Sequence, residues 1–192
     1  RYSGVAPWPS VIEQVAAMVL LALREGEPAV SVADIPPSEG IKWRLRPFLL
    51  ERQPTLLYGP GGSAKSLFAQ YLSIAISLPL LNIGYDIEPG PTLYLDYETD
   101  RDDFQRRCAG LSEALGYPLP KSVYYRRCFH PLAAEVAEIQ RIVAERGGQF
   151  IVVDSAGLAG GGQPQDESVV IPYFGALRQL GVASLTIGHE AK

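Results

Sequence analysis

One segment of the chain says most about its architecture: Thr55-Leu56-Leu57-Tyr58-Gly59-Pro60-Gly61-Gly62-Ser63-Ala64-Lys65-Ser66. Its first four residues predict a β-strand, and the pattern after the glycines predicts a helix over Lys65–Leu78. The glycines permit backbone conformations closed to other residues, so consecutive N–H groups can turn inward. The order of strand, glycine-rich turn and helix is the context that a phosphate-binding loop requires.

The polar residues that close this segment have the chemistry of a nucleotide site. Lys65 is predicted to contact the β- and γ-phosphates of ATP, and the Ser66 hydroxyl to ligate Mg²⁺. Ala64 stands where the usual pattern has glycine; it is tolerated with helical dihedrals and harmful if the position needs a positive φ. The plainer alternative is a glycine-rich turn before an ordinary helix. The predicted nucleotide-binding residues are Gly59, Pro60, Gly61, Gly62, Ser63, Ala64, Lys65 and Ser66.

Downstream of this loop, short apolar runs alternate with helical patterns. The predicted strands are Thr92–Asp96, Val123–Arg126, Phe150–Asp154 and Ala183–Gly188, and the predicted helices are Arg101–Leu115, Leu132–Glu145 and Glu167–Leu180. Near-continuous apolar strands separated by helices indicate an α/β fold with a mostly parallel sheet and helices on both faces. Ligands of such sheets bind at the carboxyl ends of the strands.

Carboxylates follow two of these strands. Asp154 ends one of them and is predicted to hold the Mg²⁺ shell, although a strand-end aspartate can also simply begin a turn. Glu98 follows Thr92–Asp96, and we predict that it is the catalytic base that orients and deprotonates water. Asp96 competes for this role, because strand alternation places it on the same face as Glu98. Asp100 is assigned to capping the next helix.

Further candidates are a histidine and several cations. His189 ends the last strand-like run and could hydrogen-bond the γ-phosphate, with a purely structural histidine as the alternative. Lys192 is either a cation that acts on a neighbouring subunit or a solvated side chain. The pairs Arg106–Arg107 and Arg126–Arg127 are candidates for phosphate or neighbour-subunit contacts, although most such arginines are solvated.

The composition bounds the class of protein. The 192 residues carry a net charge of −4, so any contact with nucleic acid must be local. The two cysteines lack metal-site spacing and no signal peptide precedes them, which predicts a cytoplasmic location. The longest apolar run, Val15–Leu23, is too short to span a bilayer, so no membrane contact is expected.

The sequence divides into two expected parts. Residues 1–40 hold a short N-terminal helix, Val11–Arg24, and a linker, and residues 41–192 hold the ATPase core. Ile41–Glu51 is expected to pack on this core, and Gly157–Gln165 to form a mobile loop. Because the chain starts without methionine and stops after a strand-like run, we expect the C-terminal part of the core to lie beyond Lys192.

The order and spacing of four segments resemble the motifs of RecA-like P-loop ATPases, particularly the hexameric replicative helicases of plasmids and phages. These segments are Gly59–Ser66, Thr92–Glu98, Phe150–Asp154 and Thr186–Lys192. The resemblance covers residues 41–192 and implies a three-layer RecA-like fold. It implies that Lys65 and Ser66 bind phosphate and magnesium, that Glu98 is the base, that Asp154 is the second acid and that His189 belongs to a sensor segment. It also implies a homo-oligomer, a hexameric ring or a filament, in which a neighbour supplies an arginine or lysine to ATP.

The favoured hypothesis is an ATP-hydrolysing motor domain of a DNA helicase, or of the helicase part of a replication protein. Single-stranded DNA as a partner rests on the resemblance alone, because Gly157–Ser168 contains no lysine or arginine. One alternative is a nucleotide-gated recombination or assembly ATPase that does not unwind DNA. Another is a P-loop phosphotransferase, against which the placement of Glu98 and His189 argues.

Overall fold

The computed structural model describes the chain except for residues 1–7, 26–28, 79–82, 164 and 191–192. The described chain divides into two compact units, Arg1–Gly40 and Ile41–Lys192. The first contains helix α1 (Trp8–Glu25) and the 3₁₀ helix η1 (Val32–Asp34). Helix α1 therefore begins three residues before the predicted Val11. None of the described helices combines the length and the apolar character needed to cross a lipid bilayer.

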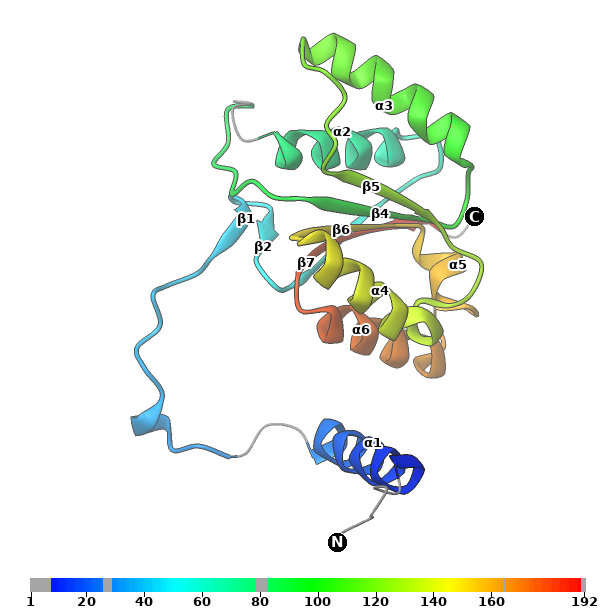
Figure 1. Cartoon of the computed structure of the whole chain (residues 1–192). Helices are drawn as coiled ribbons and strands as arrows, with labels where there is room; N and C mark the ends of the chain where they lie inside the picture. The colour runs from blue at the N-terminus through cyan, green and yellow to red at the C-terminus, as the bar shows by residue number, and fades with distance from the viewer. Residues whose placement is uncertain (1–7, 26–28, 79–82, 164, 191–192) are drawn as a thin grey trace, which may run out of the picture. The chain divides into compact units, whose positions relative to one another are not determined.

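The second unit is a five-stranded, wholly parallel sheet with the order β3-β7-β6-β4-β5. Its strands are β3 (Pro54–Gly59), β4 (Thr92–Asp96), β5 (Val123–Arg127), β6 (Phe150–Asp154) and β7 (Ala183–His189). Its helices are α2 (Lys65–Ser77), α3 (Arg101–Leu115), α4 (Leu132–Arg146), α5 (Ala156–Gly160) and α6 (Glu167–Leu180). Helices α2 and α3 cover one face of the sheet, and α4 and α6 cover the other (Figure 1). This three-layer arrangement is the RecA-like P-loop fold that the sequence predicted.

Alternate residues of the central strands supply two separate apolar cores. In β4, Tyr94 packs with α2 and α3, whereas Leu93 and Leu95 pack with α4 and α6. In β6, Val152 lies in the first core and Val153 in the second. Side chains of a strand point alternately to opposite faces, so a parallel sheet covered on both sides needs apolar residues at nearly every position. This requirement explains why these strands are continuous apolar runs.

The strand order determines which side chains can meet at the edge of the sheet. Strand β7 lies between the strand of the glycine-rich loop, β3, and the strand of Asp154, β6. Gly59 is in register with His189, and Asp96 with Asp154. Four neighbouring strands therefore bring their carboxyl ends to one edge.

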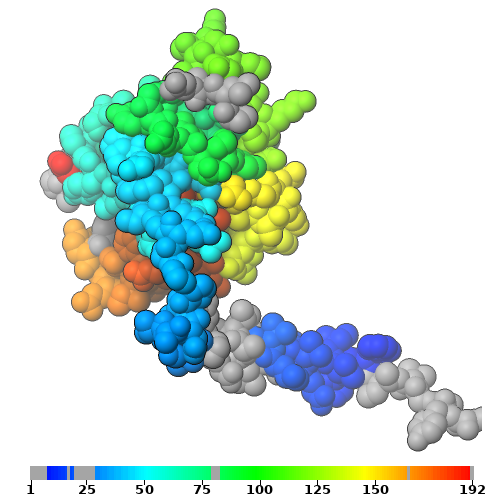
Figure 2. Space-filling model, turned by 90° about the vertical axis from the view of Figure 1, so that its left-hand side faces the viewer, coloured from blue at the N-terminus to red at the C-terminus, as the bar shows by residue number. Residues whose placement is uncertain are grey.

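A small antiparallel pair, β1 (Trp43–Leu45) and β2 (Leu49–Leu50), packs on the core, as expected for Ile41–Glu51. Its anchor is Arg44, which is only 2% exposed. Arg44 donates to the Glu88 carbonyl oxygen at 2.8 Å and to Gln149 Oε1 at 2.8 Å. In the space-filling view the light-blue hairpin lies against the green segment that precedes β4 (Figure 2).

The segment after β6 differs from the expected mobile loop Gly157–Gln165. Its first part belongs to helix α5, whose Ala159 is 1% exposed and lies in the second core. The glycines that suggested a loop permit close packing instead, since a Cβ at Gly160 would lie 2.9 Å from a Val169 methyl group. Residue 164, within the expected loop, lies outside the described residues.

Candidate active site

The glycine-rich loop has the geometry of a phosphate cradle. It joins the end of β3 at Gly59 to the start of α2 at Lys65, and Gly62 has a φ of 76°. Within the described part of the chain, the backbone N–H groups from Gly61 through Ala64 donate to no protein acceptor. Free N–H groups beside a helix N-terminus attract anions, because the helix dipole adds partial positive charge. The loop can therefore bind phosphate oxygens.

Lys65 is folded back onto the loop and is 7% exposed. Its Nζ donates to the carbonyl oxygens of Gly59 at 2.9 Å and Pro60 at 2.7 Å, and to Ser63 Oγ at 3.2 Å. An ammonium group has three donors, so the loop satisfies all of them. Contact between Lys65 and a phosphate requires the exchange of at least one of these bonds.

Ala64 has a left-handed conformation, with φ of 60° and ψ of 21°. The favourable alternative, helical dihedrals, is therefore wrong for this position. Ala64 is the N-cap of α2 and has no side-chain capping bond, and its carbonyl oxygen accepts the N–H of Phe68 at 2.9 Å. The turn from loop to helix demands the positive φ, which costs a residue with a Cβ roughly 1–2 kcal/mol.

Asp154 is the last residue of β6 and is 3% exposed. Tyr94 donates its hydroxyl to Asp154 Oδ2 at 2.6 Å, whereas Oδ1 has no hydrogen-bond partner among the described residues. Burial raises the pKa of Asp154, the hydroxyl groups of Tyr94 and the nearby Ser66 oppose this rise, and the nearby charges of Glu98 and Asp96 add to it. Mg²⁺ binds oxygen ligands, and Asp154 offers it a buried carboxylate with one unpaired oxygen next to the Ser66 hydroxyl.

Asp96 and Glu98 have different surroundings. Asp96 is 1% exposed, and its Oδ1 accepts the N–H groups of Glu98 at 2.9 Å and Thr99 at 2.8 Å. Its Oδ2 accepts the Thr99 hydroxyl at 2.6 Å and the Tyr125 hydroxyl at 3.1 Å. Both carboxylate oxygens of Asp96 thus hold the turn that carries Glu98. Strand β4 ends at Asp96, so the alternation that placed the two acids on one face does not extend to Glu98.

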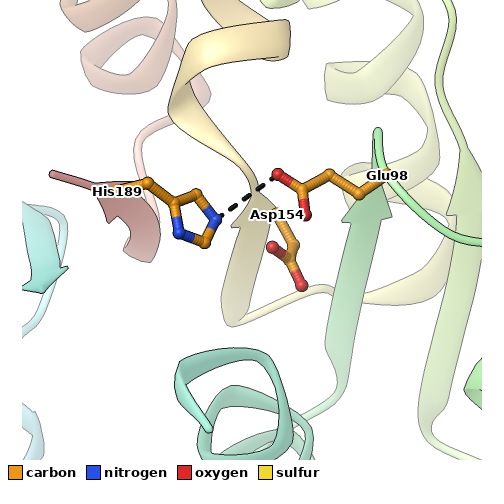
Figure 3. Close-up of side chains that lie close together, drawn as sticks. All are labelled: Glu98, Asp154 and His189. Carbon is orange, nitrogen blue, oxygen red and sulfur yellow. Dashed lines mark ion pairs between the residues drawn. The ribbon is translucent and has the colours of Figure 1, made fainter. Parts of the chain in front are cut away.

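Glu98, Asp154 and His189 converge at the carboxyl edge of the sheet (Figure 3). Their carboxylate oxygen and imidazole nitrogen atoms lie within 4.8 Å of one another. His189 Nε2 is 3.4 Å from Glu98 Oε1, which also accepts a hydrogen bond from the Ser155 hydroxyl. The structure therefore brings together two acids and a histidine that lie far apart in the sequence.

The loop and His189 also line a common cavity of about 460 Å³. The lining residues are Gly62, Ser63, Ala64, Lys65, Ser66, Leu67, Arg107 and His189. Arg107 reaches this cavity from α3, and its guanidinium pairs with Asp103 at 2.6 Å. Arg107 is thus the candidate arginine that lines this cavity.

The other candidate cations lie elsewhere. Arg106 pairs with Asp103, and Arg126 with Glu135 at 3.1 Å. Arg127 Nη1 lies 3.5 Å from Asp96 Oδ1, beside the turn of Glu98. Lys192 lies outside the described residues.

The sequence alone did not predict that Tyr94 and Ser155 belong to this site. Tyr94 stands in an apolar strand and reads as a core residue, so nothing in the pattern indicates the partner of its hydroxyl. Ser155 follows Asp154 directly, and this adjacency is the only signal that could have found it.

Comparisons with known proteins identify the family of the chain. The search of curated proteins found no match to the chain. A protein-family model described as an AAA domain matches residues 24–192, which include the glycine-rich loop and all three converging side chains. Since this match covers most of the sequence, the chain belongs to the AAA domain family.

Proposed function

We propose that the chain is the ATP-binding and ATP-hydrolysing motor domain of a DNA helicase, or of the helicase part of a replication protein. Membership of the AAA domain family supports an ATPase. The observation that carries the proposal is the convergence of Glu98, Asp154 and His189 at the edge where the phosphate loop opens. A phosphotransferase needs a second substrate in place of water, whereas a carboxylate at this edge suits the activation of water.

In the proposed reaction the loop from Gly59 through Ser66 holds the triphosphate. The N–H groups of Gly61 through Ala64 and the Lys65 ammonium bind its oxygens. Ser66 and Asp154 would hold Mg²⁺, which neutralises charge on the β- and γ-phosphates.

Glu98 takes a proton from water while the water oxygen attacks the γ-phosphorus. The bond from phosphorus to the bridging oxygen breaks, and ADP leaves with that electron pair. His189 lies 3.4 Å from Glu98, so its contact with the γ-phosphate would link the presence of that phosphate to the position of the base.

The proposed partners are ATP, single-stranded DNA and further copies of the chain in a hexameric ring or a filament. In such an assembly an arginine or lysine of the neighbour completes the ATP site. These partners rest on the resemblance in the sequence, because Gly157–Ser168 offers DNA no basic side chain.

The decisive experiment combines ATP hydrolysis with strand displacement. We expect single-stranded DNA to stimulate hydrolysis and a forked duplex to be unwound. Stimulation without unwinding would favour the nucleotide-gated assembly ATPase, and transfer of phosphate to a small-molecule acceptor would favour the phosphotransferase.

Two substitutions test the assigned residues. Lys65→Ala should abolish tight ATP binding, whereas Glu98→Gln should retain binding and lower turnover by about 100-fold or more. The matched control is Glu113→Gln, which removes an exposed carboxylate on α3 and should leave both quantities unchanged. Normal turnover in Glu98→Gln would show that the base is assigned wrongly.

A further inference from the structure

The three converging side chains offer a ligand set that differs from the one proposed for Mg²⁺. Mg²⁺ prefers oxygen ligands, which Ser66 and Asp154 supply. Imidazole nitrogen combined with carboxylates suits zinc, cobalt and similar divalent ions. His189 adds such a nitrogen to the carboxylates of Glu98 and Asp154. Among the described residues, these three form the only group of three or more histidine, cysteine or acidic side chains close enough to share an ion.

The spacing of the ligand atoms fits a small divalent ion. Ligands at about 2.0–2.2 Å from a tetrahedral ion lie roughly 3.3–3.6 Å from one another. His189 Nε2 and Glu98 Oε1 are 3.4 Å apart, which is the length of such an edge. All three ligand atoms lie within 4.8 Å of one another, so side-chain rotations that move these atoms by on the order of 1 Å would bring all three to ligand distance from one ion.

One oxygen in the group is prepared for a ligand. Asp154 is 3% exposed, and its Oδ1 lacks a hydrogen-bond partner among the described residues while Tyr94 holds Oδ2. Ser155 in turn holds the carboxylate of Glu98. Hydroxyl groups that orient ligating carboxylates in this way raise metal affinity. Figure 3 shows the three side chains turned toward one another.

We propose that Glu98, Asp154 and His189 form a binding site for a divalent transition metal ion, such as Zn²⁺ or Co²⁺, and that its occupation inhibits ATP hydrolysis. A bound ion takes a lone pair of the Glu98 carboxylate and offsets its negative charge, so this carboxylate becomes a weaker base toward water. It also takes the free oxygen of Asp154, so it competes with Mg²⁺ and ATP. The inhibitory part rests on the proposed function; the binding of the ion does not.

The chain offers few competing sites for such an ion. It contains two histidines and two cysteines. Cys108 and Cys128 are buried, and burial raises the pKa of these thiols to about 12 and about 11. Because metals bind the thiolate, these cysteines are poor ligands in the folded protein. His130 is exposed in the turn before α4 and supplies a matched control for His189.

The test is a titration of the nucleotide-free chain with Co²⁺, followed by its visible absorption, with Zn²⁺ added afterwards to displace it. We expect one equivalent of Co²⁺ to bind. His189→Ala should weaken binding by at least about tenfold, and His130→Ala should bind like the wild type. Glu98→Gln provides a second ligand variant, and circular dichroism checks that each variant is folded.

The second arm measures hydrolysis with Zn²⁺ present. We expect inhibition that a chelator reverses and that higher concentrations of Mg²⁺ and ATP relieve. The site is refuted if the wild type binds no Co²⁺, or if His189→Ala binds it as tightly as the wild type. Binding of Zn²⁺ without inhibition would refute the regulatory role. A chain that binds Co²⁺ but never hydrolyses ATP would instead refute the proposed function.

Discussion

At the scale of single residues, the site depends on hydroxyl groups that hold its acids in place. Tyr94 donates to Asp154, and Tyr125 donates to Asp96 at 3.1 Å. The ring of Phe104 lies 4.7 Å from each of the two tyrosine rings, centroid to centroid. Both tyrosines therefore belong to one aromatic array, but their hydroxyls serve different carboxylates. This arrangement provides a matched pair of substitutions.

Tyr94→Phe keeps the ring and removes the donor to Asp154. Hydrogen bonds to charged groups contribute about 1.5–3 kcal/mol, so the Mg²⁺-dependent part of ATP affinity should fall about tenfold or more. A fluorescent ATP analogue measures this affinity with Mg²⁺ and with EDTA. Affinity in EDTA should not change, and Tyr125→Phe should keep the Mg²⁺ dependence of the wild type. Equal Mg²⁺ dependence in Tyr94→Phe would contradict a positioning role for its hydroxyl.

Ala64 presents strain at the residue scale. Its φ of 60° is one that glycine adopts freely, so Ala64→Gly should raise the free energy of unfolding by about 0.5–1 kcal/mol. Urea unfolding measures the change. The control is Ala137→Gly at an exposed position inside α4, where the same chemical change should cost about 1 kcal/mol. If both variants lost stability equally, the left-handed conformation of Ala64 would be refuted.

At the scale of elements, a polar N-cap residue begins helix α3 beside the site. Asp100 is the N-cap of α3, and its carboxylate accepts the Asp103 N–H at 2.9 Å, which confirms the predicted cap. Gly116 is the C-cap of α3, and its φ of 72°, which glycine adopts without a steric cost, lets its N–H donate to carbonyl oxygens of the last turn. This helix carries Phe104 into the aromatic array and Arg107 to the cavity. Its ends therefore affect the geometry of the site.

Asp100→Ala should lower the free energy of unfolding by about 1 kcal/mol, because the first turn of α3 loses a hydrogen bond to its backbone. Asp102→Ala is the control, since Asp102 also lies in the first turn but does not cap it. At 0.5 M salt, where its interaction with the helix dipole is screened, this control should change stability by a few tenths of a kcal/mol. Chemical denaturation distinguishes the two variants. Equal losses would indicate charge rather than capping.

At the scale of the whole molecule, the two apolar cores each enclose one cysteine. Cys108 lies in the core under α2 and α3, and Cys128 in the core under α4 and α6. Burial raises the pKa of both thiols above the ordinary value of 9.0. Below pH 9 both folded and unfolded thiols are protonated. Above pH 9 the thiols of the unfolded chain ionise before the buried thiols of the folded chain. The free energy of unfolding therefore falls as the pH rises from 9 towards 11.

At pH 8, a thiol reagent should therefore modify both cysteines of the folded chain at least about tenfold more slowly than in the unfolded chain. Absorbance of the released chromophore follows the reaction, and the chain in concentrated urea provides the control. Fast modification of Cys108 alone would show that the core under α2 and α3 opens locally. Fast modification of both would contradict the two closed cores.

Local patterns in the sequence predicted much of this architecture. Continuous apolar runs predicted the five parallel strands, and the spacing from Tyr58 to Ser66 predicted the phosphate loop, because each depends on neighbouring residues alone. The sequence by itself did not disclose the order of the strands, the left-handed Ala64 or the helix α5. Each of these is decided by packing against residues elsewhere in the chain.

In the site, too, local sequence patterns predicted the residue types, and tertiary packing decided their contacts. The sequence predicted site roles for Lys65, Glu98, Asp154 and His189, but only the tertiary structure decided which of their atoms meet. Tyr94 and Asp154 are 60 positions apart, and Glu98 and Ser155 are 57 positions apart. Periodicity specifies which face of a strand a side chain occupies, but not which strand lies beside it. That choice is made by the burial of both sheet faces at once, which is a property of the folded chain as a whole.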